Sequence, residues 1–454
     1  MISVAESIFK GDSIRWLERV LFERFGLVLL IKKNEIGSIT LHLEGYSGLI
    51  EFSSDGDEFG EGKYDVPFIE FDLANEPVSS FLPGHVPAPG LLRKTGLIDK
   101  IEVGHRVNYN IIALAYWMMN RVEELDRDDL DSHGRFPAKS SHAVKHGYLS
   151  RPIVDEWLFI LGQIIVLQWP DVVLKTHQFE MKVSHDVDMP GRYAFASTFK
   201  MFRRMAGDLL RGNIKNFFYA PLCKWRAKSK ISKFDPANTF EWIMDVSEQH
   251  GVVSAFYFIC GRTDPALDGD YEIEHLAIRK LLLTIHRRGH EIGLHPSYNT
   301  YKSLPILLKE AERLRKVCAQ EGISQTVWGG RMHYLRWAHP QTLLAWEAAG
   351  MQYDSTLGYA DVPGFRCGTC FEYPAFDPKE HKILNIRIRP LIAMEVSIMD
   401  GHYLGLGATE EAFLKFKELK DICRVAGGSF TLLWHNSHFA EAAEFDIYKR
   451  VIAC

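Results

Sequence analysis

The feature that most constrains the fold is a regular alternation of strand-like and helix-like segments from Thr176 to the end of the chain. Short runs rich in β-branched and aromatic residues are separated by longer runs with helical periodicity. Repeated strand-then-helix units with short connections predict a parallel sheet or barrel covered by helices. The expected strands are 178–184, 252–260, 291–294, 326–330, 352–355, part of 384–396 and 429–434, and the expected helices are 239–249, 272–288, 304–320, 340–349 and 409–425.

The first 175 residues lack this alternation. The segment 108–126 is apolar on more than one side, which is typical of a helix buried in a core. A chain of 454 residues also exceeds the size at which a single core stops growing. We therefore expect two domains: a smaller α+β accessory domain over residues 1–175 and an α/β domain over residues 176–454.

The overall composition excludes several classes of protein. A net charge of -5 argues against a general nucleic-acid binder, which needs a clearly basic surface. The N-terminal segment lacks the features of a secretory leader, and no apolar run reaches the length of a membrane span, so we expect a cytoplasmic location. The seven cysteines are scattered and do not require disulfides.

The first strand of the alternating region ends in the sequence KVSHDVDMP, residues 182–190. Asp186 and Asp188 stand at i and i+2, so in an extended chain they project to the same side. Two unpaired carboxylates in such a position repel each other, and one of them is driven to take up a proton. A bound cation, or a cation together with an arginine, removes that cost. The alternative is a polar turn rich in aspartate.

Polar side chains also follow the later predicted strands. In parallel α/β folds, chemistry gathers at the carboxyl ends of the strands. Several strand ends that converge in this way predict a site rather than a set of solvated loops. The residues concerned are His295 and Asn299 after the third strand, Arg331 and His333 after the fourth, Asp354 after the fifth and His435 after the last.

Four motifs in this order resemble those of the polysaccharide deacetylases with a NodB-type domain, carbohydrate esterase family four. The resemblance covers roughly residues 176–454 and implies a distorted (β/α) barrel. The N-terminal sequences HGRFPAKSS and RPIVDEW resemble the extra domain that precedes some bacterial members associated with surface-polysaccharide synthesis. The four motifs are SHDVD at 184–188, GHEIGLH at 289–295, RMHY at 331–334 and LLWHN at 432–436.

The resemblance implies that Asp188 and His295 are metal ligands. The ion would be divalent, most readily zinc, with cobalt, nickel or manganese as alternatives. This chain departs from the family pattern at the usual second histidine, where it has Asn299. The third ligand is therefore open between Asn299 and His333, and His185 is a further candidate.

The resemblance also assigns catalytic roles. Asp186 would be the base, with Arg331 holding it ionised and oriented. The backbone N–H of Tyr334 would bind the oxyanion, and His435 would act as the general acid. Beyond the family motifs, Arg366 could grip an anionic part of the substrate, because guanidinium groups bind phosphate and carboxylate well.

These roles together imply a metal-dependent hydrolase that removes an N-acetyl group from an amino sugar in cell-surface polysaccharide biosynthesis. An amidase or deformylase acting on another N-acyl compound shares the same chemistry. A glycoside hydrolase that uses Asp186 and Asp188 would need a separation of about 5 to 9 Å between its carboxylates. The substitution at Asn299 also leaves open a carbohydrate-binding pseudoenzyme without catalytic activity.

A basic and aromatic insert occupies residues 192–233, in which Asp208 is the single acid. Such a segment could lie on an anionic membrane as an amphipathic structure, which would suit a lipid-linked or nucleotide-linked sugar substrate. A helical insert with a solvated basic face is the alternative.

Overall fold

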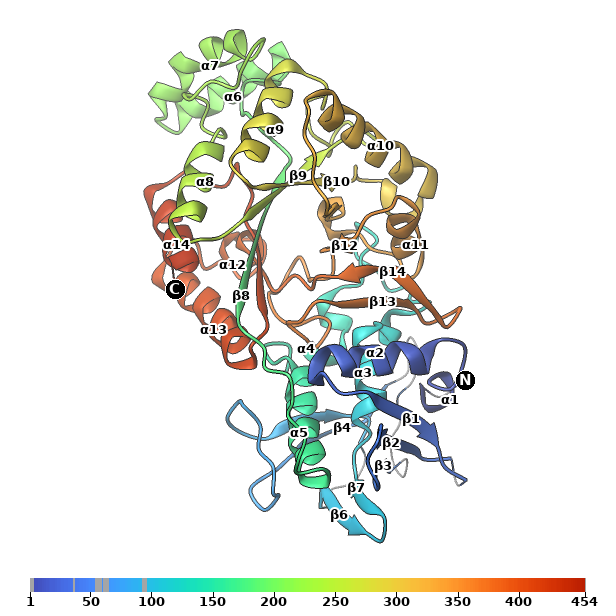
Figure 1. Ribbon diagram of the computed structural model, residues 1–454. Coiled ribbons are helices and arrows are strands. Elements are labelled where there is room, and N and C mark those ends of the chain that lie inside the picture. The colour runs from blue at the N-terminus through green and yellow to red at the C-terminus, as the bar shows by residue number, and fades with distance from the viewer. Residues whose placement is uncertain (1–3, 36, 54–58, 60–64, 92–95, 454) are drawn as a thin grey trace. The chain divides into compact units, whose positions relative to one another are not determined.

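The computed structural model describes residues 4–35, 37–53, 59, 65–91 and 96–453 (Figure 1). The chain divides into two compact units. Unit 1 also takes in two later segments that the sequence had assigned to the second domain. Unit 1 comprises Met1–Glu180, Gly364–Pro390 and Lys420–Phe430, and unit 2 comprises Met181–Pro363, Leu391–Leu419 and Thr431–Cys454.

Unit 1 contains a mixed five-stranded sheet in the order β1-β2-β3-β7-β6. Strands β3 and β7 are parallel, and the other neighbours in this sheet are antiparallel. Two antiparallel hairpins, β4–β5 and β13–β14, also belong to this unit. The strands are β1 Leu29–Lys33, β2 Ile39–Leu43, β3 Leu49–Phe52, β4 Phe68–Phe71, β5 Val86–Pro89, β6 Ile98–Ile101, β7 Gly104–Val107, β13 Tyr373–Asp377 and β14 Lys382–Ile388.

Helix α3, Ile111–Met119, forms the centre of unit 1. All nine of its residues are buried, which confirms the prediction of a core helix in this region. The helix begins after Asn110, whose side chain accepts a hydrogen bond from the backbone N–H of Ala113 at 2.9 Å. The remaining helical segments are α1 Val4–Ser7, α2 Ser13–Phe25, η1 Val122–Glu124, η2 Ala138–Ser140, α4 His142–Lys145 and α5 Ile153–Gln168.

Unit 2 is built on a row of strands in the order β12-β11-β10-β9-β8-β16-β15. The pairings from β8 through β12 are parallel, as is the pairing of β15 with β16. This confirms the predicted α/β architecture, whereas a closed barrel is not shown by the pairings between described residues. The strands are β8 Glu180–Val187, β9 Ser254–Ile259, β10 Glu291–His295, β11 Gly329–Gly330, β12 Tyr353–Asp354, β15 Ala393–Met394 and β16 Ser429–Leu433.

Helices separate most of these strands along the chain, as the sequence predicted, and α8 to α11 lie on the outer side of the strands in Figure 1. Their amphipathic pattern explains this position, since each buries one face against the sheet. The helical segments are α8 Phe240–Gln249, α9 Leu276–Arg287, η3 Thr300–Lys302, α10 Leu304–Gln320, η4 His333–Leu335, α11 Gln341–Ala348, α12 Glu395–Met399, α13 Glu410–Ala426 and α14 Ala442–Ala453.

Strands β10 and β11 approach closely because Gly330 has no side chain. A Cβ atom at this position would lie 1.8 Å from the carbonyl oxygen of Leu294. The next residue, Arg331, donates its backbone N–H to the same carbonyl at 3.1 Å. The two strand ends that carry His295 and Arg331 are thereby brought side by side.

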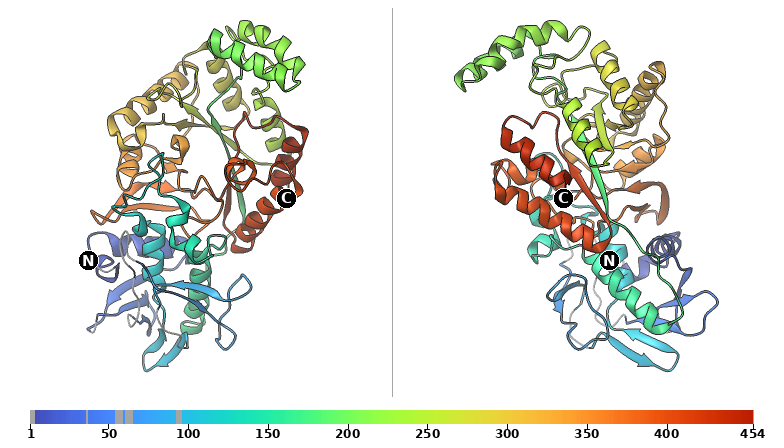
Figure 2. Two further views of the ribbon diagram at one scale, coloured as in Figure 1. Left: turned by 180° about the vertical axis from the view of Figure 1, so that it is seen from behind. Right: turned by 60° about the vertical axis from the view of Figure 1, so that its left-hand side comes forward.

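The basic insert forms two helices, α6 Thr198–Leu210 and α7 Ile214–Arg226. They pack against each other and project from the rest of unit 2 in both views of Figure 2. No helix among the described residues is both long enough and apolar enough to cross a membrane.

Candidate metal and catalytic site

Three side chains from three strand ends of unit 2 could hold a metal ion. The Oδ1 atom of Asp188, just after β8, lies 3.2 Å from Nε2 of His295 and 3.6 Å from Nε2 of His333. This Oδ1 is buried and has no hydrogen-bond partner among the described residues. A buried carboxylate oxygen facing two imidazole nitrogens is costly unless a cation binds there. The donor set of one carboxylate and two imidazoles is one that zinc-type ions accept.

Hydrogen bonds on the far side of each ring orient both histidines. Nδ1 of His295 donates to the carbonyl oxygen of Arg331 at 2.6 Å. Nδ1 of His333 donates to Oδ1 of Asp268 at 3.0 Å. These bonds fix the tautomers in which both Nε2 atoms point their lone pairs toward Asp188, as in many metal sites.

Asn299, the other predicted candidate for the third ligand, is exposed and engaged elsewhere. Its Oδ1 accepts a hydrogen bond from Arg336 at 3.1 Å, and its Nδ2 donates to the carbonyl oxygen of Thr263 at 3.3 Å. The geometry therefore favours His333 over Asn299 as the partner of Asp188 and His295.

His185, the further candidate, points away from this group. Its Nδ1 donates to the carbonyl oxygen of Trp434 at 2.7 Å, and its ring stacks on Phe256. Burial lowers the pKa of His185 to about 4 although the Trp434 carbonyl opposes the shift, so the ring is neutral at neutral pH. The residue packs inside unit 2.

Asp186 and Arg331 form a buried ion pair beside the metal group. The Nη1 atom of Arg331 donates to Oδ1 of Asp186 at 2.8 Å. Further hydrogen bonds from the guanidinium to Ser184 Oγ at 2.9 Å and to Ser355 Oγ at 3.0 Å hold the arginine rigidly. The other oxygen of Asp186, Oδ2, lies 3.7 Å from Nε2 of His295. The ion pair therefore holds the carboxylate in a fixed orientation, directed at the group of ligands.

His435 approaches the same group from the end of β16. Its Nε2 lies 3.7 Å from Oδ2 of Asp188, and its Nδ1 donates to Oε1 of Glu395 at 2.6 Å. Burial disfavours the imidazolium, but the Glu395 carboxylate outweighs burial and raises the pKa of His435 to about 10. The pKa of Glu395 is correspondingly held below its usual range, against burial, by His435 and His438. The raised pKa favours the protonated form of His435, and the bond to Glu395 fixes the orientation of its ring.

Tyr334 lies in the single-turn segment η4, directly after His333. Its backbone adopts φ 61° and ψ 17°, a left-handed conformation that non-glycine residues seldom take. Such strain is typical of functional sites. The turn follows the strand end that carries Arg331, where the resemblance places an oxyanion donor.

Arg366 does not support the predicted role in substrate binding. It belongs to unit 1, is 3% exposed, and donates from Nη2 to Oε2 of Glu124 at 2.6 Å and from Nε to Oε1 at 3.0 Å. Both arms of the guanidinium fork that bind anions are therefore used inside the protein. The interpretation of Arg366 as a substrate ligand is corrected to a buried structural ion pair.

Asp188 lines a small cavity of about 190 Å³ in unit 2. Lys200 and Arg204 of helix α6 also line it, and Lys200 pairs with Asp270 at 2.7 Å. The helical insert and the candidate metal group therefore border the same cavity.

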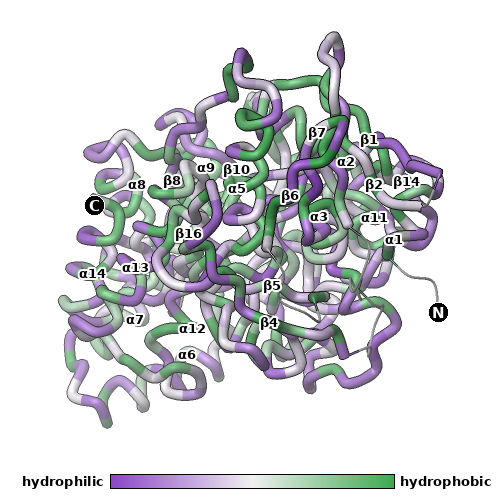
Figure 3. Tube along the Cα trace, turned by 90° about the horizontal axis from the view of Figure 1, so that it is seen from below, coloured by the Kyte–Doolittle hydropathy of each residue, from purple (hydrophilic) through white to green (hydrophobic). Residues whose placement is uncertain are grey.

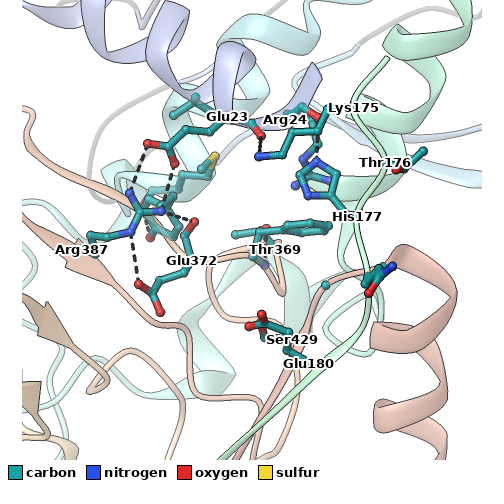
Figure 4. A pocket seen from close by; sticks show the side chains of 17 residues that line it. Glu23, Arg24, Lys175, Thr176, His177, Glu180, Thr369, Glu372, Arg387 and Ser429 are labelled. Atoms are coloured by element: carbon teal, nitrogen blue, oxygen red, sulfur yellow. Dashed lines mark hydrogen bonds and ion pairs between the residues drawn. The ribbon is translucent and has the colours of Figure 1, made fainter. Parts of the chain in front are cut away.

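A larger cavity of about 490 Å³ lies wholly in unit 1 (Figure 4). Figure 4 shows Arg387 between Glu23 and Glu372, with Nη2 to Glu23 Oε2 at 3.0 Å and Nε to Glu372 Oε1 at 3.2 Å. Arg24, which also lines the cavity, pairs with Asp155. The two arginines of the cavity are therefore engaged in ion pairs within unit 1.

Comparisons with known proteins say little about this site. Residues 38–170 match the model of a family of unknown function, DUF7033. No curated protein matches the chain. A solved structure described provisionally as a polysaccharide deacetylase from Mycobacterium smegmatis is 16% identical, with 63% of this chain and 85% of that chain covered and a TM-score of 0.38. At that TM-score the likeness carries no argument, so the functional case depends on the geometry of the site.

Two residues of the site were not assigned roles from the sequence. Glu395 is the partner of His435. Asp268, the partner of His333, was not singled out. The position of Glu395 could have identified it as a candidate, because it is an acid that directly follows the end of a strand, β15, at Met394. Asp268 lies in a loop, and nothing in its local sequence distinguishes it from other loop acids.

Proposed function

We propose that this chain is a metal-dependent hydrolase of the polysaccharide deacetylase type that removes an N-acetyl group from an amino sugar. The observation that carries the proposal is the buried Oδ1 atom of Asp188, which faces Nε2 of His295 and of His333 without a hydrogen-bond partner among the described residues. A carboxylate–arginine pair stands on one side of this group and a carboxylate–histidine pair on the other. Glycosidase carboxylates face a sugar ring rather than two histidines, so this arrangement favours amide hydrolysis.

Asp188, His295 and His333 are the residues that would hold the ion. A divalent ion of the zinc type would supply a Lewis acid that polarises the amide carbonyl and lowers the pKa of water. Zinc is the first expectation, and cobalt, nickel or manganese could bind at the same site.

The chain's own side chains would then move the protons. Asp186 accepts a proton from the attacking water, and Arg331 keeps Asp186 ionised and correctly turned for this step. The backbone N–H of Tyr334 donates to the oxygen of the acyl group as negative charge develops on it. His435 donates its proton to the sugar nitrogen as the C–N bond breaks. The products are acetate and a free amino sugar.

We further propose that the row of parallel strands in unit 2 is part of the distorted barrel of this enzyme type, and that the reaction serves cell-surface polysaccharide assembly in the cytoplasm. The four motifs in their characteristic order support this assignment. An amidase or deformylase would use the same residues, so the choice of acyl group and sugar has to come from assays.

The test is acetate release from N-acetylated oligosaccharides and nucleotide-linked N-acetylamino sugars. The purified protein should release acetate, lose activity in EDTA and regain it with zinc. Asp186→Asn should abolish acetate release while retaining bound metal, because Asp186 is the proton acceptor rather than a ligand. Release of formate alone would support a deformylase. Full activity after complete removal of transition metals would overturn the proposal.

A further inference from the structure

Helices α6 and α7 form a hairpin, hereafter the α6–α7 hairpin, with a small core of its own. Six buried residues make this core, and Phe217 and Phe234 pack against it. Side chains that point away from this core are therefore not needed to hold the two helices together. The core residues are Tyr193, Ala196, Met201, Met205, Ala220 and Cys223.

Helix α6 carries a stripe of large apolar side chains that face solvent. Phe199, Phe202 and Leu210 are 77%, 59% and 89% exposed. Their spacing of three and eleven residues places them on one face of the helix, away from the face of the buried Met201 and Met205.

Helix α7 has a similar stripe. Ile214, Phe218 and Trp225 stand at i, i+4 and i+11, and they are 55%, 71% and 65% exposed. The buried Ala220 and Cys223 lie on the opposite face. Soluble proteins rarely expose so many large apolar groups in one place unless the surface binds something. In Figure 3, short hydrophobic and hydrophilic stretches alternate along both helices.

The insert is strongly basic. Residues 192–233 hold a single acid, Asp208, which is buried and paired with Arg192 at 2.9 Å. Five exposed basic side chains make no ion pair with any described residue. These are Arg203, Lys215, Lys228, Lys230 and Lys233.

We propose that the α6–α7 hairpin docks on an anionic lipid bilayer. The aromatic stripes would enter the boundary between headgroups and acyl chains, and the basic residues would contact anionic headgroups. Each helix has 13 residues, or about 20 Å, so it is suited to lie in the membrane plane and is too short to cross it. A second copy of the chain is disfavoured as the partner, since two such hairpins would bring uncompensated positive charges together.

The proposal is independent of the proposed enzymatic function, because docking can be measured without substrate. The full chain is sedimented with vesicles of phosphatidylcholine alone or mixed with phosphatidylglycerol. Binding should require phosphatidylglycerol and weaken as salt rises. The triple variant Arg203→Glu, Lys215→Glu and Lys228→Glu should bind at least roughly a hundredfold more weakly, since each basic residue near an anionic surface contributes about a factor of five.

A matched control reverses the charge of three exposed lysines elsewhere in unit 2, in the triple variant Lys280→Glu, Lys309→Glu and Lys316→Glu. This variant should bind vesicles nearly as the unaltered chain does, because the three lysines lie on α9 and α10. Equal losses in the two triple variants would overturn the proposal, because they would indicate a general effect of net charge.

The apolar stripe is tested separately with Phe202→Ser and Phe218→Ser, which should weaken binding about tenfold or more. The matched control is Leu276→Ser and Leu414→Ser, at positions 49% and 53% exposed outside the hairpin. Vesicles containing brominated acyl chains should quench tryptophan fluorescence in the unaltered chain and much less in Trp225→Phe.

Two results would reject a bilayer as the occupant. The first is absence of vesicle binding together with a concentration-dependent dimer that the two serine substitutions abolish, which would identify a second copy of the chain instead. The second is binding without quenching by the brominated chains, which would mean that the aromatic residues do not insert.

Discussion

Replacement of Asp268 by asparagine should weaken metal binding without removing any ligand. The carboxylate of Asp268 is buried, and its Oδ1 accepts hydrogen bonds from Nδ1 of His333 at 3.0 Å and from the backbone N–H of Tyr298 at 2.8 Å. Its Oδ2 accepts from the backbone N–H of Asp264 at 2.7 Å. Burial opposes the charge, but these bonds hold the pKa of Asp268 below its usual value, so the group is ionised when it orients His333.

The size of the effect follows from these contacts. An asparagine has one acceptor oxygen, so its NH₂ group must face either Asp264 or the pair formed by Tyr298 and His333. In the better orientation His333 keeps a neutral hydrogen bond, which is roughly half as strong as the charge-assisted one. Loss of such a partner typically lowers metal affinity about 10- to 100-fold, or ~1.4 to 2.7 kcal/mol.

The assay is competition for zinc between the protein and a chromophoric chelator. Asp264→Asn is the matched control, because that carboxylate accepts from the backbone N–H of Ala266 at 2.9 Å rather than from a histidine. It should bind zinc within about threefold of the unaltered chain, since it leaves the orientation of His333 intact. His333→Ala should lose more than 100-fold, because it removes a ligand rather than a supporting bond.

Asn299→Ala separates the two candidates for the third ligand. If the side chain of Asn299 only forms its hydrogen bonds with Arg336 and Thr263 and does not bind the ion, zinc affinity should hardly change in this variant. Unaltered affinity in Asp268→Asn combined with a large loss in Asn299→Ala would refute His333 as the third ligand.

Three further outcomes are expected. Glu395→Gln should lower kcat by about 100-fold or more with metal content unchanged, because His435 loses the carboxylate that orients and charges it; acetate release at saturating zinc measures this. Glu395, His435 and His438 form a second group that could hold a metal ion. The proposed function instead uses Glu395 and His435 as an acid pair, so metal analysis should find one ion per chain, and His438→Ala should not change that number. Burial raises the pKa of Glu124, but Arg366 and a second arginine outweigh burial and set this pKa at about 2, below the ordinary 4.5. The ionised carboxylate therefore contributes ~3 kcal/mol to the stability of the folded state. This contribution is complete above pH 4.5 and disappears as pH falls toward 2. Urea titrations should therefore show Glu124→Gln destabilised at pH 7, with the difference shrinking below pH 4.5.

Much of the site could be predicted from the sequence because its residues follow strands. The strand expected at 178–184 corresponds to β8, and the i and i+2 spacing placed Asp186 and Asp188 on one side of the extended chain. The rule that parallel strands gather chemistry at their carboxyl ends then joined them to His295 and Arg331, which the structure brings together. These signals are local, so a single sequence carries them.

Contacts between distant parts of the chain could not be predicted in this way. The guanidinium group of Arg366 suggested an anion-binding residue, but its partner Glu124 stands 242 positions away in the sequence. Asp268 reaches His333 across 65 positions from an irregular loop. In both cases the deciding fact is which two buried charges meet, and no periodicity or motif encodes that pairing.

The departure at Asn299 illustrates why spacing alone left the third ligand open between Asn299 and His333. Two residues four positions apart face one ion when they share an α-helical turn. The chain after His295 does not form such a turn: Asn299 stands immediately before the short 3-10 segment η3, Thr300–Lys302. The neighbouring strand β11 instead ends beside β10 because of the close approach at Gly330, and the turn after it delivers His333 to the same point. An asparagine at position 299 is therefore no evidence that metal binding is lost, since the adjacent strand end can supply the ligand that a helical turn would otherwise provide.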